Sequence, residues 1–376
     1  MLNSGFIVPE EENELEKVKM LIKETDINDE LFSLMVLPTM NCNFKCWYCY
    51  ESHIKGSKMQ EPALNKIKLL LNNKFNTMQN MKNFHLSYFG GEPLLYFDDV
   101  VLPTLRHTYN LSKQHNISLF THFTTNGFLI NDYVMENLVK YEVNSFQITF
   151  DGNKENHNKV RYVSKTRGSY DGIVSNIKRL VRSNIKVSLR INYTNDNIDG
   201  LYDILDSFQD LSMDNRKKIT LHMQRVWQEK KTEGLFQKSR QVSDKFNEFG
   251  FQLPNPKALN TLRQSCYADK KYQAAINYNG DVFKCNARDF KKENREGILN
   301  DKGEIEWNAQ FYDRMSIKLK NKPCQECSIM PICGGGACSQ YALERKNEDF
   351  CIHDFDEKSK KNVILEMFLN GDHTRV

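Results

Sequence analysis

Apolar residues along the first two thirds of the chain follow two alternating patterns. Short apolar runs, typical of strands, are separated by longer stretches in which apolar residues recur every three or four positions, as on one face of a helix. This alternation predicts strands at 31–39, 84–90, 117–125, 145–150, 186–194 and 218–226, and helices at 62–77, 98–114, 131–140 and 170–183. Strands that alternate with helices form parallel sheets, so the expected fold class is α/β, a partial (βα)6 TIM-type barrel.

The pattern changes at both ends of this region. Residues 1–30 are polar and are expected to form an N-terminal extension. Beyond Pro254 and Pro256 the chain turns to short segments rich in Cys, Gly and Lys, with little periodicity. We therefore expect a barrel domain over 31–250, a small Cys-rich domain over 255–355 and a C-terminal tail over 356–376.

Several predicted strands carry polar residues at every second position, which places these residues on one face of the sheet. The rows are His122, Thr124 and Asn126; Gln147, Thr149 and Asp151; Ser188, Arg190 and Asn192; and His222 with Gln224. Any single row could belong to a solvent-facing edge strand. Four rows together favour a polar barrel interior, which needs a polar occupant, because ordinary barrels fill their interior with branched apolar side chains.

Composition and charge exclude several classes of protein. The 376 residues carry a net charge of only +4, which gives no reason to expect nucleic acid or a membrane as a partner. No run approaches the roughly 18 consecutive apolar residues of a membrane span. The N-terminus is acidic, whereas a secretory signal is basic and then apolar. We expect a cytoplasmic protein.

The ten cysteines fall into two groups. Cys42, Cys46 and Cys49 lie in one short block, and the other seven lie between Cys266 and Cys351. Because a reducing cytosol disfavours disulfides, this distribution indicates two metal-bearing regions.

The first group, Cys42-Asn-Phe-Lys-Cys46-Trp-Tyr-Cys49, directly follows the first predicted strand, at the end of the strands where barrel active sites lie. Three thiolates can hold three irons of a 4Fe–4S cluster and leave one iron open. A zinc site with His53 as a fourth ligand is the alternative. The CX3CX2C spacing resembles the signature of the radical S-adenosylmethionine (SAM) superfamily. In that family the open iron binds SAM, and one-electron reduction yields methionine and a 5′-deoxyadenosyl radical.

Other positions of the predicted barrel resemble the same family. The run Gly90-Gly91-Glu92-Pro93 looks like its GGEP motif, which would hold the SAM ammonium. Arg161, downstream of Asp151-Gly152, resembles an arginine that pairs with the SAM carboxylate. The cofactor-binding residues that this resemblance implies are Tyr48, Gly90, Gly91, Glu92, Thr124, Asn126, Asp151, Arg161 and Arg190, with Tyr48 near the adenine.

The second group of cysteines resembles the SPASM domain, which binds two auxiliary 4Fe–4S clusters in a subset of radical SAM enzymes. Its Cys324-X2-Cys327-X5-Cys333-X4-Cys338 block has one residue more in the last spacing than the family usually has. The family's ligand scheme would assign an outer auxiliary cluster to Cys324, Cys327, Cys333 and Cys351, and an inner one to Cys266, Cys285 and Cys338. Three clusters would then use all ten cysteines, and the inner cluster would keep an iron open to a substrate thiolate or water.

SPASM enzymes most often act on peptides or proteins, so the resemblance implies a radical SAM oxidoreductase with such a substrate. Two reactions compete. Peptide maturases install a thioether or carbon-carbon crosslink in a ribosomally made precursor (RiPP), whereas sulfatase maturases convert a Cys or Ser into formylglycine. The latter carry an Asp base directly after the second Cys of the inner cluster, where this chain has Asn286. This difference favours a peptide maturase.

The segments Ser-Gly-Phe-Ile-Val at 4–8 and Pro38-Thr39 to Tyr50-Glu51 also resemble peptide maturases. Expected partners are a precursor peptide and a flavodoxin- or ferredoxin-type reductant. Since the first predicted strand begins near residue 31, we expect the leader peptide to be bound elsewhere on the chain or by a separate partner protein. Candidates for the residue that accepts the proton are Asp289, Tyr267 and His222. The alternative of another class is a non-catalytic iron-sulfur or zinc-binding protein, which needs no SAM site.

Overall fold

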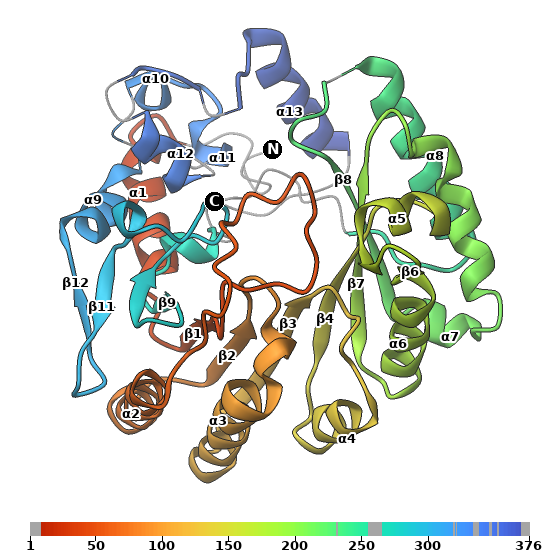
Figure 1. Ribbon diagram of the computed structural model, residues 1–376. Coiled ribbons are helices and arrows are strands. Elements are labelled where there is room, and N and C mark those ends of the chain that lie inside the picture. The colour runs from red at the N-terminus through yellow and green to blue at the C-terminus, as the bar shows by residue number, and fades with distance from the viewer. Residues whose placement is uncertain are drawn as a thin grey trace.

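The computed structural model describes residues 9–230, 232–254, 265–318, 320, 322–333, 338–345, 348–351 and 353–369. One ten-stranded sheet dominates it, in the order β12-β11-β10-β9-β1-β2-β3-β4-β7-β8. Six strands run parallel in chain order: β1 (Leu31–Val36), β2 (Asn83–Tyr88), β3 (Ser118–Thr125), β4 (Ser145–Phe150), β7 (Lys186–Tyr193) and β8 (Ile219–Arg225). Figure 1 shows the sheet curved into an open arc. The predicted α/β class and partial barrel are confirmed, and each of the six predicted strands overlaps one of these.

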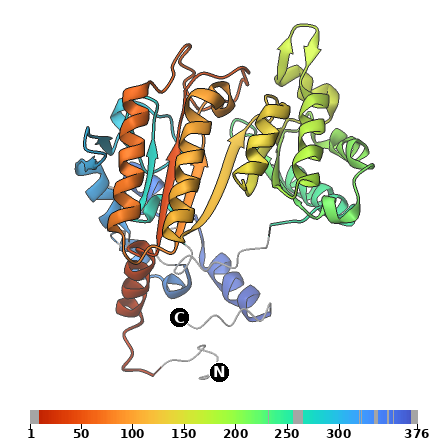
Figure 2. The ribbon, with the colours of Figure 1, turned by 90° about the horizontal axis from the view of Figure 1, so that it is seen from below.

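Helices cover the outer, convex face of the arc (Figure 1). They are α2 (Glu61–Thr77), α3 (Leu102–His115), α4 (Asp132–Lys140), α6 (Tyr170–Arg182) and α8 (Glu233–Glu248). The first four correspond to the predicted helices, and α2 lies beside α3 in Figure 2 as well. Shorter turns complete the connections: η2 (Pro93–Tyr96), the π-helical turn η3 (Phe97–Val101), α5 (Lys154–Val160), the hairpin of β5 (Tyr162–Ser164) and β6 (Arg167–Gly168), η4 (Ile198–Phe208) and α7 (Met213–Arg216).

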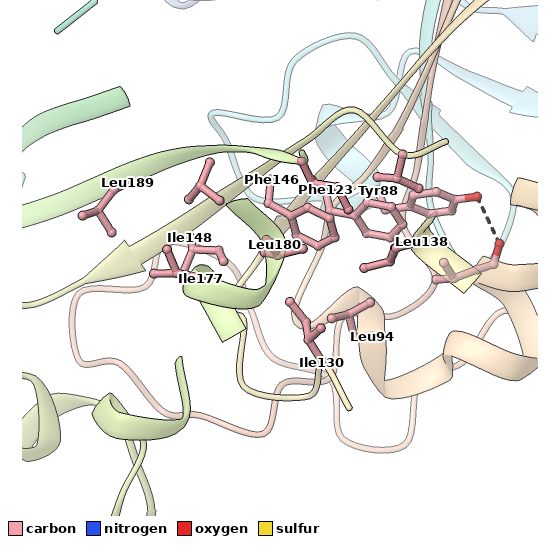
Figure 3. Packing of buried hydrophobic residues seen from close by; sticks show 14 of the residues in the cluster. Tyr88, Leu94, Phe123, Ile130, Leu138, Phe146, Ile148, Ile177, Leu180 and Leu189 are labelled. Carbon is pink, nitrogen blue, oxygen red and sulfur yellow. Dashed lines mark hydrogen bonds between the residues drawn. The ribbon is translucent and has the colours of Figure 1, made fainter. Parts of the chain in front are cut away.

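Apolar side chains from the outer face of the strands pack against these helices. Tyr88, Phe123 and Phe146 come from three neighbouring strands and stack in a row, as Figure 3 shows. Their ring centroids lie 4.6 Å apart for Tyr88 and Phe123, and 4.9 Å for Phe123 and Phe146. The buried Tyr88 hydroxyl lies 2.8 Å from Thr104 Oγ1. Alternate residues of a strand point to opposite faces of the sheet. The polar residues that neighbour these aromatic residues along each strand therefore face the interior.

The Cys-rich region continues the barrel sheet. β9 (Gln273–Ile276) pairs in parallel with β1, and β10 (Asp281–Phe283), β11 (Gly297–Leu299) and β12 (Ile305–Trp307) follow in antiparallel order. Strands of three or four residues leave no periodic signal in a sequence, so this connection was not predicted.

The remaining helices gather at one end of the molecule (Figure 1). They are α1 (Glu14–Asp26), α9 (Ala309–Ile317), α10 (Lys322–Gln325), α11 (Met330–Cys333), α12 (Ser339–Glu344) and α13 (Glu357–Leu369). Two short turns complete the Cys-rich region: η5 (Tyr267–Asp269) precedes β9, and η6 (Lys292–Asn294) lies between β10 and β11. Val18 and Ile22 of α1 form a small buried cluster with Met330, so the N-terminal extension packs on the Cys-rich region. Within the described ranges, no helix is both long and apolar enough to cross a membrane.

Candidate active site

The interior of the partial barrel holds a cavity of about 760 Å³, which we call the lumen cavity. Its wall includes five residues of the predicted polar rows, namely His122, Thr124, Gln147, Arg190 and Gln224. Because β3, β4 and β7 each lie between two other strands, their rows do not lie on an edge of the sheet. In the fourth row, on β8 at the end of the sheet, Gln224 lines the cavity whereas His222 is exposed.

A second cavity, of about 170 Å³, adjoins the first, and we call it the motif cavity because Cys42, Cys46 and Cys49 line it. Tyr48, Tyr50, Thr124, Gln147 and Arg190 line both cavities. Of the nine residues expected to bind the cofactor, Glu92 and Asp151 are not part of the motif cavity wall; the others are Tyr48, Gly90, Gly91, Thr124, Asn126, Arg161 and Arg190.

The three thiols of the motif cavity lie on the loop that follows β1. Burial, followed by the negative charge of Glu92, raises the pKa of Cys42 to about 12, and burial raises that of Cys49 to about 11. Thiols of this kind stay protonated until a metal replaces the proton. Three thiols on one loop are the donor set of a 4Fe–4S cluster with one open iron, so the residues fit this group.

The zinc alternative requires four ligands around one ion. His53 Nε2 lies 3.5 Å from Cys49 Sγ, so a His is at hand. In the part of the chain that the structure describes, however, no three Cys, His, Asp or Glu side chains are arranged to hold a single metal ion.

Gly90 and Gly91 bring the backbone after β2 close to the loop that carries the thiols. Gly90 has φ +108°, a conformation that side chains disfavour, and a Cβ there would lie 2.5 Å from Thr39 O. A Cβ on Gly91 would lie 2.2 Å from Asn41 O. Only glycine permits this approach, so the pair forms the backbone wall of the motif cavity.

We expect Gly91→Ala to weaken SAM binding by roughly tenfold to a hundredfold, because overpacking of about 1–3 kcal/mol must be relieved by moving this wall. Isothermal titration of the reconstituted protein with SAM measures the change. Gly234→Ala is the matched control, because a Cβ at Gly234 meets nothing within 4 Å. Equal affinities of the two variants would contradict the assignment of Gly91 to the SAM site.

Glu92 lies behind this wall and is fully buried. Its carboxylate accepts hydrogen bonds from Thr125 Oγ1 at 2.6 Å, from the Asn126 amide at 2.8 Å and from the Leu94 amide at 3.0 Å. Burial raises the pKa of Glu92, and the hydrogen bonds from Thr125 and Asn126 oppose the rise. The Glu92 side chain thus joins the ends of β2 and β3, while the glycine backbone faces the motif cavity.

Arg161 is positioned by two other residues of the site. Its Nε lies 2.5 Å from Asp151 Oδ2, and its Nη2 donates to Tyr48 OH at 2.9 Å. Tyr48 OH also donates to Asp151, and Asn192 Nδ2 lies 3.3 Å from the same carboxylate. Asp151 and Arg161 are both buried, so this network fixes one planar guanidinium at the wall of the motif cavity.

Asn286 and Asp289 follow Cys285 and form the wall of the lumen cavity that faces the thiol loop. The Asn286 backbone carbonyl accepts a hydrogen bond from Tyr50 OH at 2.7 Å. Asp289 accepts from the Ser52 amide at 3.0 Å and from Ser52 Oγ at 2.5 Å. Tyr50 and Ser52 therefore tie the thiol loop to the loop of Cys285, although more than two hundred residues separate them along the chain.

The three candidate proton acceptors are placed differently. Asp289 and Tyr267 line the lumen cavity, whereas the exposed His222 does not. Tyr267 OH donates to Asn286 Oδ1 and accepts from the Asn286 amide at 3.0 Å. A further carboxyl, Glu51, is buried at the motif cavity, and burial, followed by the charge of Asp289, raises its pKa to about 8. No role for Glu51 was predicted, because nothing in the sequence pattern marks it as buried.

The cysteines of the C-terminal region occupy two places. Burial raises the pKa of Cys266 to about 11, and the charges of Asp269, Cys285 and Cys338 add to it. The other four, Cys324, Cys327, Cys333 and Cys351, line one cavity of about 50 Å³, which we call the outer cysteine cavity. These are the groups that the ligand scheme assigns to the inner and outer auxiliary clusters. Residues 4–8, and residues 334–337 within the lengthened spacing, lie outside the described part of the chain.

Comparison with known proteins identifies the barrel. The sequence profile of the Radical SAM superfamily matches residues 36–208. The chain is 31% identical over 170 residues to a cysteine-type anaerobic sulfatase-maturating enzyme of Clostridium novyi (strain NT), which covers 42% of each protein. It is 24% identical over 230 residues to the radical SAM cyclopropyl synthase TigE of Paramaledivibacter caminithermalis, which covers 56% of this chain and 46% of TigE. The chain thus spans less than half the length of these two relatives.

Two solved structures share the fold over most of the chain. Native anSMEcpe with bound AdoMet has a TM-score of 0.62 at 18% identity and covers 90% of this chain and 97% of its own. Streptococcus suis SuiB bound to S-adenosylmethionine has a TM-score of 0.59 at 18% identity, with 88% of this chain and 78% of SuiB covered. The two structures cover 90% and 88% of this chain, so the likeness in fold extends beyond the barrel into the Cys-rich region.

Proposed function

Residues 36–208 form a radical SAM domain, and from this premise we propose that the chain is a peptide maturase that installs a thioether or carbon-carbon crosslink in a ribosomally made precursor. The proposal includes a SPASM region with two auxiliary 4Fe–4S clusters. Its support is the joint placement of a thiol loop, a glycine backbone wall and a fixed arginine around the motif cavity, beside a larger polar cavity.

The cofactors would sit in the motif cavity. When bound, the 4Fe–4S cluster and SAM supply the one-electron chemistry that yields a 5′-deoxyadenosyl radical. Cys42, Cys46 and Cys49 would hold the cluster, and the backbone of Gly91 would face the SAM ammonium. Arg161, fixed by Asp151 and Tyr48, would bind the SAM carboxylate as a planar fork.

The peptide would enter the lumen cavity. Its volume of about 760 Å³ lies within the roughly 300–1,000 Å³ typical of ligand sites. Burial lowers the pKa of His122 to about 4, so this side chain is neutral near pH 7, and its Nδ1 lies 2.8 Å from Ser145 Oγ. Neutral polar groups of this kind can orient a peptide without a strong preference for charge. The walls would also exclude water from the reacting carbon.

Asn286 is the observation that supports the peptide-maturase reaction over the sulfatase-maturing one. It occupies the position where sulfatase maturases carry an Asp base, and an amide does not accept a proton at neutral pH. Here Tyr267 binds its side-chain oxygen and Tyr50 binds its backbone carbonyl. The amide therefore acts as a fixed link between the lumen wall and the thiol loop.

Asp289 does not replace the missing base in this proposal. Burial raises its pKa, but the hydrogen bonds from Ser52 and the charge of Lys291, whose Nζ lies 3.5 Å away, outweigh burial and hold the pKa below its usual range. A carboxylate stabilised in its charged form is a weak general base. We assign Asp289 to the link with Ser52, and Tyr267 to the link with Asn286.

One observation favours the second candidate, an anaerobic sulfatase-maturing enzyme. The relative at 31% identity from Clostridium novyi carries that name. A non-catalytic iron-sulfur protein is the candidate of another class, and the motif cavity argues against it, because an electron carrier needs no site for SAM. A peptide maturase and a sulfatase-maturing enzyme make different products, whereas a non-catalytic protein makes none, so one assay separates the three.

The test uses the complete chain, reconstituted with iron and sulfide without oxygen and supplied with SAM and dithionite. We expect about twelve irons per chain and formation of 5′-deoxyadenosine. Short open reading frames beside the gene are co-expressed with the enzyme, and each peptide product is examined by tandem mass spectrometry. The expected product has lost two hydrogen atoms and carries a crosslink in its fragmentation pattern.

Other products would contradict the proposal. Formylglycine in a co-expressed sulfatase, with no change in any short peptide, would establish the sulfatase-maturing reaction. Iron near four per chain, or zinc in its place, would contradict the SPASM assignment. A protein with iron but without 5′-deoxyadenosine formation would be an iron-sulfur protein of the non-catalytic class.

A further inference from the structure

The outer cysteine cavity is lined by more than thiols. His353, Phe355 and Lys360 share its wall with Cys324, Cys327, Cys333 and Cys351. Cys324 and Cys333 belong to α10 and α11, and Cys327 lies between these helices. Cys351, His353 and Phe355 lie between α12 and α13, and Lys360 is in the first turn of α13. The cavity therefore brings an imidazole and an ammonium to the site of four sulfur atoms.

The imidazole ring of His353 packs on an aromatic neighbour, but its Nε2 has no hydrogen-bond partner among the described residues. Its ring stacks on Phe355, with centroids 4.9 Å apart and an angle of 19° between the ring planes. Its Nε2 is buried, and among the described residues no group lies within hydrogen-bonding distance of it. A buried polar atom without a partner costs roughly 1–3 kcal/mol, so a partner is expected in the cavity that the ring lines.

Lys360 is placed differently. Its Nζ pairs with Glu357 Oε1 at 2.7 Å on the same helix. Glu357 therefore engages one of the three N–H donors of Lys360, whereas His353 Nε2 has no partner among the described residues. His353 is thus the basic side chain of this wall whose buried polar atom still needs a hydrogen bond.

We infer that His353 donates a hydrogen bond from Nε2 to a sulfur atom of the outer auxiliary cluster and thereby raises the reduction potential of this cluster. The inference rests on the proposed function, which assigns a 4Fe–4S cluster to these four cysteines. Reduction adds negative charge to the cluster sulfurs, so a donor aimed at sulfur stabilises the reduced state more than the oxidised state. His353 is thus a positioning and tuning residue and not a ligand, because four thiolates already complete the cluster.

The test compares His353→Phe with His353→Gln. Phenylalanine keeps an aromatic ring on Phe355 and removes the donor, whereas glutamine keeps an N–H donor. Both are made in a chain whose Cys42, Cys46 and Cys49 are replaced by Ala, so that the SAM-binding cluster does not overlap the auxiliary signals. Redox titration followed by electron paramagnetic resonance measures the potential of each remaining cluster, independently of turnover.

We expect the ratio of reduced to oxidised outer cluster at a fixed potential to fall about tenfold in His353→Phe, which corresponds to about 59 mV for a one-electron couple. His353→Gln should recover most of this loss, and the inner cluster should keep its potential in both variants. His115→Phe is the control, because His115 contacts Phe75 on the outer side of the barrel. It should leave both potentials unchanged.

Three results would overturn the inference, and they differ. If His353→Phe contains the outer cluster and titrates as the parent does, the cluster scheme stands and the hydrogen bond from His353 does not exist. If the parent chain itself shows only one auxiliary signal and about four irons, the proposed outer cluster is absent and the imidazole has no acceptor there. Loss of iron in His353→Phe and in His353→Gln alike would make His353 a structural residue.

Discussion

Replacing Cys42, Cys46 and Cys49 together by Ala is expected to remove one 4Fe–4S cluster and to abolish SAM cleavage. The three thiols lie on one loop, and they are the cysteines of the described chain that line the motif cavity. Alanine offers no donor to iron, and the auxiliary thiols lie on other segments. Iron should fall from about twelve to about eight per chain, and 5′-deoxyadenosine should become undetectable by liquid chromatography.

Lys45→Ala is the matched control for this variant. Lys45 lies between the cysteines on the same loop, but its side chain is exposed to solvent. Its replacement tests whether any change in the loop disturbs the site, and we expect full iron content and undiminished SAM cleavage. If the triple Cys variant kept all its iron, or if Lys45→Ala lost as much activity, the thiols would not be the ligands of the SAM-binding cluster.

The barrel could be predicted from the sequence because its strands have two chemically different faces. Phe123 and Phe146 face the helices, while His122 and Gln147, which lie beside them in sequence, face the lumen cavity. A period of two is visible in any such strand. The same property makes the lumen predictable, since a polar residue on the inner face of a buried parallel strand has no other explanation than a polar interior.

Residues that support the site were harder to recognise. Glu92 and Asp151 stand in motifs that suggest contact with a ligand, and the structure adds the bonds that each makes to protein groups at the cavity wall. Ser52 carries no signal at all, because its partner Asp289 lies on a distant segment. Sequence spacing reports which residues are neighbours along the chain, whereas burial and hydrogen bonding depend on segments that meet only after folding.

The Cys-rich region also combines features that the sequence predicts with features that it does not. Cysteine is rare and its spacing is distinctive, so the sequence predicts how the thiols are grouped, and the structure places Cys324, Cys327, Cys333 and Cys351 around one cavity. The short strands β9 to β12 and the charged groups around them could not be predicted. Lys284, Glu296 and Arg314 look like ordinary surface charges in the sequence, but all three are buried.

Arg314→Met is expected to destabilise the protein by roughly 3–5 kcal/mol, because it leaves a buried charge without its partner. Arg314 Nε lies 2.6 Å from Glu296 Oε1, and both side chains are 3% exposed. The pair also bears on the inner cysteines. Glu296 Oε2 accepts a hydrogen bond from the amide of Lys284, which precedes Cys285, and Arg314 Nη1 donates to Ser339, which follows Cys338.

This arrangement predicts two linked losses in Arg314→Met: a lower urea midpoint of unfolding, and a weaker electron paramagnetic resonance signal from the inner cluster. Arg182→Met is the matched control, because Arg182 and Asp210 pair 2.9 Å apart with both side chains about half exposed. Exposed pairs of this kind contribute about 0–1 kcal/mol, so the control should unfold as the parent does. Equal midpoints for the two variants would show that the buried pair does not stabilise the region. A lower midpoint with an undiminished inner-cluster signal would separate its role in stability from the positioning of Cys285 and Cys338.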